Sequence, residues 1–205
     1  MTAKGHILTS GFSVFLPLAF LNSNKDLFAI SIFEFIPIDN ELDMLIILLS
    51  VYFGSLLPDI DEPESRIGRK FPIVSNVIKS IFGHRGITHT LAFPLLFIVL
   101  SIYFESLRYL FAGIALGVIN HILGDMLTKG GIKNIFFPFL KGNTYGLLPK
   151  DFRFYTNSAF ERFIILPVLF VMNFFVAFYF INSFSSLPIL NFMNQNIKTV
   201  FASVI

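Results

Sequence analysis

The chain has 205 residues, of which 55% are hydrophobic and only 14% are charged, and its mean hydropathy is +0.75. This balance is too apolar for a soluble domain of this length and predicts a membrane protein. The formal net charge of +2 implies no nucleic-acid partner, and the absence of cysteine excludes disulfides and thiolate metal ligands.

Five apolar segments follow one another along the chain, and we expect each to form a membrane helix. Only the last reaches the roughly 20 residues that span a bilayer unaided, so the others must be extended by their polar ends. The expected fold is all-α: a polytopic helical membrane protein with about five transmembrane helices. The segments are Ile7–Leu21, Met44–Leu57, Leu91–Phe104, Tyr109–Leu123 and Phe163–Phe184.

The apolar segments alternate with polar motifs and no linker separates them, which predicts a single domain over residues 1–205. Its motif-bearing part covers about residues 1–175, and residues 185–205 are expected to form a peripheral C-terminal segment. The apolar stretch Phe28–Ile38 is interrupted by a glutamate and a proline, which favours an interfacial or re-entrant piece. No small-residue cleavage site follows Ile7–Leu21, so we expect this segment to remain in the mature protein.

The basic residues are unevenly divided between the two faces that five crossings would create. The positive-inside rule places the richer face in the cytoplasm, and the predicted location is the inner (cytoplasmic) membrane. The same basic residues can instead serve an anionic substrate, and the sequence leaves both explanations open. The richer face holds Lys4, Arg66, Arg69, Lys70, Lys79, Arg85, Lys129, Lys133, Lys141, Lys150, Arg153 and Arg162, and the other holds Lys25, Arg108 and Lys198.

All four histidines and three aspartates lie at the ends of apolar segments, on the same predicted face. Such groups at membrane depth are costly unless something binds them, which favours a metal site at one helix-end face. Imidazole and carboxylate ligands suit zinc, manganese or iron better than copper(I). The candidate ligands are His6, Asp59, Asp61, His84, His89, His121 and Asp125.

His121 and Asp125 are four residues apart, so both lie on one face of a helix. A hydrogen bond between them on a helix surface has the same spacing and is the plain alternative. His84 and His89 are five apart in a glycine-containing stretch, where Thr88 is a candidate N-cap for the following helix. They are expected to converge, and the alternative is a solvent-facing loop.

Asp59 and Asp61 follow Pro58, which favours an extended or turn conformation. In extended chain the two carboxylates point the same way, where a cation relieves their repulsion. A charged turn that caps a membrane helix is the alternative. His6 alone would be an ordinary surface residue, and only its place on the same face adds it to the set.

Seven candidate ligands exceed the three that a catalytic zinc usually takes from the protein, which favours two metal ions. Asp61 is expected either to bridge the ions or to act as base toward water, and Arg85 to stabilise developing negative charge. Arg66, Arg69 and Lys70 can clamp a phosphate or contact lipid headgroups.

Four ordered motifs resemble the YdjM family, bacterial membrane proteins interpreted as metal-dependent hydrolases. The resemblance implies a metal site on the seven candidate ligands and supplies no substrate. More faintly, the mix of an N-terminal histidine, an aspartate and the HxxxD pair looks like zinc-dependent phospholipase C enzymes, which favours phosphoester hydrolysis. The resemblance is carried by Gly5-His6, Leu57-Pro58-Asp59-Ile60-Asp61, Gly83-His84-Arg85-Gly86-Ile87-Thr88-His89-Thr90 and His121-Ile122-Leu123-Gly124-Asp125-Met126-Leu127-Thr128, with Gly130, Pro138 and Glu161-Arg162-Phe163.

The preferred hypothesis from the sequence is a membrane-bound hydrolase with a dinuclear site, zinc first and manganese second, that acts on a lipid or lipid-linked phosphoester at the cytoplasmic membrane face. A metal-ion transporter or a metal-sensing membrane protein is the alternative, although transporters usually bind near the bilayer midplane and this chain has no internal repeat. A third possibility is a structural metal that ties helix ends together.

Overall fold

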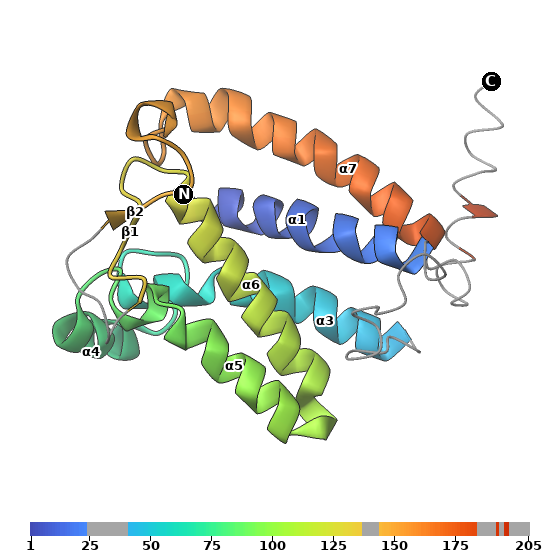
Figure 1. Ribbon diagram of the computed structural model, residues 1–205, viewed down its shortest axis with the longest axis horizontal. Helices are drawn as coiled ribbons and strands as arrows, with labels where there is room; N and C mark the ends of the chain where they lie inside the picture. Colours follow the sequence, from blue (N-terminus) through green and yellow to red (C-terminus); the bar gives the residue numbers. More distant parts are fainter. Residues whose placement is uncertain (24–40, 137–143, 184–191, 193–194, 197–205) are drawn as a thin grey trace.

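The computed structural model describes residues 1–23, 41–136, 144–183, 192 and 195–196. Most of this part is helical, which confirms the all-α prediction (Figure 1). The predicted interfacial piece Phe28–Ile38 lies outside the described residues, and so does nearly all of the predicted peripheral segment at 185–205.

Each of the five predicted apolar segments contains a long helix. Most of the short helices and a two-stranded antiparallel sheet lie at one end of the bundle, whereas η4 joins α5 to α6 at the other end (Figure 1). The long helices are α1 (Ala3–Ser23), α3 (Glu41–Gly54), α5 (Ala92–Tyr103), α6 (Arg108–Met126) and α7 (Leu166–Ser183). The shorter elements are η2 (Leu57–Asp61), α4 (Pro72–Phe82), η3 (Ile87–His89), η4 (Glu105–Leu107), β1 (Ile132–Lys133), β2 (Thr144–Tyr145), η5 (Lys150–Phe152) and the π-helical turn η6 (Glu161–Ile165).

Three helical stretches in the described residues are long and apolar enough to cross a membrane: Leu42–Asp61, Glu105–Met126 and Glu161–Asn182. α5 is apolar but has only 12 residues, which at 1.5 Å per residue is well short of a bilayer core. α1 has 21 residues but carries a lysine, a histidine and several hydroxyl side chains. Five crossings therefore remain a prediction.

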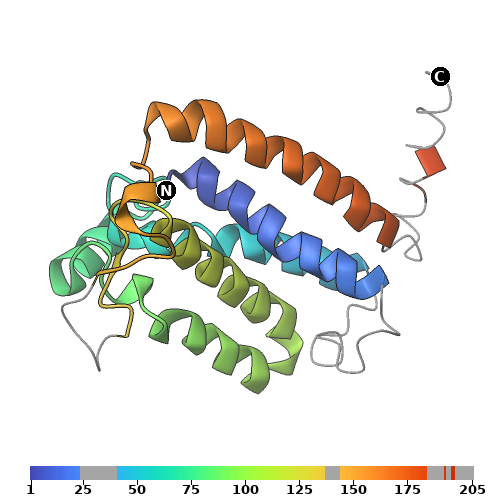
Figure 2. The same cartoon turned by 45° about the horizontal axis from the view of Figure 1, so that its top comes forward.

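α6 is the central helix and packs against α1, α3 and α5 (Figure 2). Glycines allow its close approach to α3: a Cβ on Gly113 would lie 2.0 Å from the Ser50 hydroxyl, and one on Gly117 would lie 2.2 Å from the Val51 carbonyl oxygen. Small residues four apart are the usual means by which membrane helices come into contact. This contact brings the end of α3, and the η2 turn after it, against the C-terminal half of α6.

Polar side chains fix α1 between α6 and α7. The Ser13 hydroxyl donates a hydrogen bond to the Asn120 side chain on α6. From α7, the Asn173 amide donates to the carbonyl oxygen of Leu8 at 2.8 Å. Hydrogen bonds between helices in an apolar surrounding set rotation and register, and these two orient the N-terminal turns of α1.

The amphipathic helix α4 does not belong to any of the predicted apolar segments. Its apolar residues Ile73, Val77 and Ile81 recur every four residues and are exposed, whereas Ser75 on the opposite side is buried. Continuous apolar runs were the signal used to predict helices, and a short amphipathic helix has no such run.

The N-terminus of α1, the C-terminus of α6 and the turns η2 and η3 all lie at one end of the bundle (Figures 1 and 2). These elements carry six of the seven candidate ligands, and the seventh, His84, lies in the loop just before η3.

Candidate metal centre

His121 and Asp125 lie in the last turns of α6, both buried and on the same side of the helix. His121 Nδ1 is 2.7 Å from the carbonyl oxygen of Ser55, just after α3. A carbonyl oxygen can only accept a hydrogen bond, so the hydrogen is on Nδ1. In the neutral ring, Nε2 is then left with its lone pair, the form that binds metal ions.

His89 is held in the same way from the turn η3. Its Nδ1 is 3.2 Å from the Oδ2 atom of Asp61, and the Asp61 carboxylate is completely buried. Because a carboxylate only accepts, Nδ1 carries the hydrogen here as well and Nε2 keeps its lone pair. The predicted N-cap role of Thr88 is wrong: η3 occupies Ile87–His89 and α5 begins at Ala92. The Thr88 hydroxyl instead donates to Asp61 at 2.7 Å.

The two free ring nitrogens face one another beside the carboxylate of Asp125. His89 Nε2 and His121 Nε2 are 3.2 Å apart, and Asp125 Oδ2 lies 3.8 Å from the first and 4.0 Å from the second. The point equidistant from these three atoms is about 2.1 Å from each of them, the usual zinc–imidazole bond length. Two lone pairs and a carboxylate oxygen in this arrangement repel one another unless a cation lies between them, so these residues fit a metal ion.

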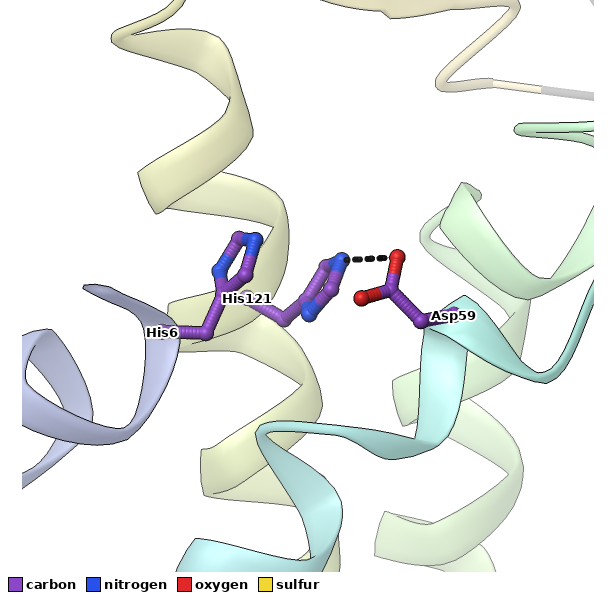
Figure 3. Close-up of side chains that lie close together, drawn as sticks. All are labelled: His6, Asp59 and His121. Carbon is purple, nitrogen blue, oxygen red and sulfur yellow. Dashed lines mark ion pairs between the residues drawn. The ribbon is translucent and has the colours of Figure 1, made fainter. Parts of the chain in front are cut away.

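Asp59 approaches His121 from η2. Its Oδ1 atom is 3.7 Å from His121 Nε2, and His6 lies on the far side of the His121 ring (Figure 3). His6, Asp59 and His121 can place one ligand atom each within 4.8 Å of one another. Of the extended and turn conformations predicted after Pro58, the structure has the turn: η2 is a 3-10 helix, and its two carboxylates contact different histidines instead of pointing the same way.

His6 is buried with no hydrogen-bond partner for either ring nitrogen. Its ring stacks on His121 with a centroid distance of 3.6 Å, and its Nε2 is 3.3 Å from Asp125 Oδ1 in poor hydrogen-bonding geometry. A buried polar atom without a partner is costly and usually indicates an unobserved ligand. Asp125 Oδ1 lies beside His6 and also accepts a hydrogen bond from the Met1 ammonium group, whereas Oδ2 lies beside His89, His121 and Arg85.

The buried Glu161 holds the start of α1 from η6. Its carboxylate accepts hydrogen bonds from Thr2 N and the Thr2 hydroxyl at 2.8 Å each, and from Asn157 N at 2.6 Å. A carboxylate at a helix N-terminus satisfies free backbone N–H groups and the helix dipole. Glu161 thereby fixes the turn of α1 that carries His6. π-helical turns such as η6 occur often at functional sites.

Asp61 and His84 lie outside both ligand groups. The Asp61 carboxylate already accepts contacts from His84, His89, Thr88 and the Arg85 backbone N–H. His84 is 42% exposed, and its hydrogen bond to Asp61 raises the pKa of its imidazole above the ordinary value. Its sequence neighbour Glu62 has a lowered pKa because Lys79 binds it at 2.8 Å.

Arg85 connects Asp61 with Asp125. Its backbone has a positive φ of 58°, and its N–H donates to Asp61 at 2.9 Å. The guanidinium binds Asp125 Oδ2 at 2.9 Å and the Gly131 carbonyl oxygen at 2.7 Å, while Nε is buried without a partner. The side chain of Arg85 therefore lies against the candidate ligand set.

The structure thus brings five of the seven predicted ligands into two groups that share His121, and places Asp61 and His84 next to them. Sequence reasoning missed Ser55, Thr88 and Glu161 as positioning residues. A carbonyl contact such as that of Ser55 has no sequence signal, whereas Glu161 was part of a family motif. The two groups are His6, Asp59 and His121, and His89, His121 and Asp125.

The fold and this cluster define a helical membrane protein with a buried histidine–aspartate site at one end of its bundle. A family model described as "YdjM inner membrane protein" matches residues 1–199. The chain belongs to the YdjM family.

Curated proteins of two bacterial species are similar to this chain. An "Uncharacterized protein YvsG" of Bacillus subtilis (strain 168) is 42% identical over 95 residues, which is 46% of this chain and 59% of the relative. The "Inner membrane protein YdjM" of Escherichia coli (strain K12) is 33% identical over 139 residues, 64% of this chain and 63% of the relative. The matches thus cover about three fifths of the length of these relatives. No solved structure matches the chain significantly.

Proposed function

We propose that this protein is a membrane-bound metal-dependent hydrolase whose dinuclear site cleaves phosphoesters. The observation that carries the proposal is the convergence of two ring nitrogens, 3.2 Å apart, on a buried carboxylate. Hydrogen bonds on the far side of each ring hold those nitrogens in the metal-binding form.

We assign the first ion to His89, His121 and one oxygen of Asp125. A second ion would be held by His6 and Asp59, which belong to the other ligand group, with the Asp125 carboxylate shared between the two ions. This arrangement uses both oxygens of Asp125 and gives the unpartnered His6 ring a role. Zinc is the proposed metal, with manganese as the second choice, because the ligands are imidazole and carboxylate.

Asp61 and Arg85 receive roles that follow from their contacts. Because both oxygens of Asp61 are already engaged, we assign it to orienting His89 instead of bridging ions or acting as base. Arg85 binds Asp125, and its guanidinium is 20% exposed, so one edge can face a substrate. A guanidinium there stabilises negative charge that develops on a phosphoryl group.

Access from outside favours an enzyme over a structural metal. Asp59 is 22% exposed and lines an open cavity, whereas His6, His89, His121 and Asp125 are at most 2% exposed. A substrate and water can therefore reach the site beside Asp59. The location at helix ends, in place of the midplane, is the feature that disfavours a transporter.

The proposed reaction is hydrolysis of a P–O bond. Water adds through its oxygen to phosphorus, the bond to the leaving alcohol oxygen breaks, and a proton is transferred to that oxygen. When bound, the metal ions lower the pKa of water and neutralise phosphoryl charge. The chain's own residues hold the ions, orient the phosphoryl group through Arg85 and exclude bulk water from all ligands but Asp59. We place this face of the protein in the cytoplasm.

The experiment is to purify wild type and Asp125→Ala in detergent and to measure metal content and phosphate release from a set of phosphoesters. We expect Asp125→Ala to insert in the membrane and to lose metal and hydrolysis together. Full metal content in this variant contradicts the ligand assignment. Metal-loaded wild type that hydrolyses no phosphomonoester or phosphodiester contradicts the hydrolase assignment.

A further inference from the structure

A second polar feature lies beside the metal centre: an open cavity of about 750 Å³ between the start of α1, the loop after η2 and the start of α7. Its size is within the range of small-molecule sites. Its wall includes Asp59, so the cavity adjoins the candidate ligands. The remaining lining residues are Thr2, Ala3, Lys4, Glu64, Ser65, Arg66, Arg69, Asn157, Arg162 and Leu166.

The charges of this wall do not balance. Four basic side chains, Lys4, Arg66, Arg69 and Arg162, face two acidic ones, Asp59 and Glu64. In the described part of the chain, no carboxylate forms an ion pair with Lys4, Arg66 or Arg69. Elsewhere in that part, some basic side chains have carboxylate partners, as in Lys79–Glu62, Arg85–Asp125 and Arg108–Glu105, and others, such as Lys133 and Arg153, have none. The cavity is distinguished by four basic side chains that line one hollow with only two carboxylates.

Two features of the wall preorganise it for an anion. The guanidinium of Arg162 is held by the Asn157 side chain through bonds of 3.0 and 2.7 Å. Lys4 in the first turn of α1 adds a further positive charge to the wall, and the hydrogen bonds from Thr2 to Glu161 hold the start of this helix in place. Guanidinium groups bind phosphate oxygens in pairs, and Arg66 and Arg69 are close enough in sequence to do so.

We propose that this cavity is the subsite for a doubly charged phosphate group, a phosphomonoester in preference to a phosphodiester. The inference rests on the proposed hydrolase function and specifies its substrate class. Two excess positive charges match a dianion, and a metal ion on Asp59 would compensate one of the two carboxylates and increase the excess. The group belongs either to a lipid headgroup or to a soluble phosphomonoester. Leu166, at the start of the membrane helix α7, is at the rim where a lipid chain would leave.

The test uses phosphonates, whose C–P bond cannot be hydrolysed, with the full-length zinc-loaded protein in detergent. Titration calorimetry, at a pH above the second pKa of the phosphonic acids, measures binding of dodecylphosphonate as a dianion, dodecyl(methyl)phosphinate as a monoanion without a P–O–C bond, and methylphosphonate as the soluble analogue. The test variant is Arg66→Gln/Arg69→Gln. The charge-matched control is Lys133→Gln/Lys150→Gln, at exposed positions outside the cavity.

We expect wild type to bind the dianion about tenfold more tightly than the monoanion, and the test variant to lose most of that preference with unchanged metal content. The control should keep the preference. A test variant that binds like wild type, or a control that loses the preference equally, overturns the subsite.

Methylphosphonate binding as tight as that of dodecylphosphonate identifies a soluble source, and much weaker binding identifies a lipid. If wild type holds no metal but still selects the dianion through Arg66 and Arg69, the hydrolase proposal fails and the subsite stands.

Discussion

The two ligand groups that share His121 differ in how their side chains are held and in how exposed they are. On the η3 side, the buried Asp61 carboxylate orients His89. Arg85 binds Asp125 Oδ2, the oxygen that faces His89. On the α1 side, His6 has no hydrogen bond at either ring nitrogen and Asp59 is partly exposed. One side is a rigid, preorganised ligand set, and the other is adjustable and accessible. A site that must hold ions and also admit a substrate needs both properties.

The largest effect is expected from His89→Ala, which removes a ligand from the rigid side. We expect the affinity for the first ion to fall by more than about 100-fold, because only His121 and Asp125 remain to hold it. Zinc titration of the purified variant with a competing chelator measures this change. The matched control is His84→Ala, since His84 lies outside both ligand groups, and wild-type affinity in His89→Ala would refute the assignment.

His6→Ala sharpens the comparison because it alters only the adjustable side. We expect it to lose one of about two ions and to keep the other with near-normal affinity, since none of the His89 contacts involve His6. Mass spectrometry of metal content reports this directly. Loss of both ions would mean that the two sides form one mononuclear site.

Asp61→Ala should have a smaller effect on the same rigid side. It leaves every ligand of the first ion in place but removes the acceptor that orients His89, so metal affinity should fall by about 10-fold to 100-fold and recover at high zinc. Glu62→Ala is the control, because the Glu62 carboxylate pairs with Lys79 and lies in neither ligand group. If Asp61→Ala cannot be loaded at any zinc concentration, Asp61 is itself a ligand.

Much of the fold followed from the sequence because long apolar runs are a strong signal. All five runs contain helices, and the polar ends that the sequence placed on one face do meet at one end of the bundle. The N-cap role of Thr88 was predicted wrongly, because Thr88 lies inside the 3-10 turn η3 and its hydroxyl donates to Asp61. Around Asp59, the predicted turn was correct and the extended alternative was not.

The identity of the candidate ligands could be predicted from the sequence, but the partner that each one contacts could not. Asp59 and Asp61 are equivalent in sequence, and only the fold turns one toward His121 and the other toward His89. The role of Glu161 depends on the start of α1 lying beside η6, a contact between residues 159 positions apart. Local pattern contains no information about such contacts.

The central claim is that this cluster binds metal, and metal content of the full-length protein in detergent tests it most directly. Mass spectrometry would compare wild type with the His121→Ala/Asp125→Ala double variant, which removes the residue shared by both groups and the proposed bridge. We predict about two zinc or manganese ions per chain in wild type and none in the variant. No bound metal in wild type, even after reconstitution with zinc and manganese, would contradict the account.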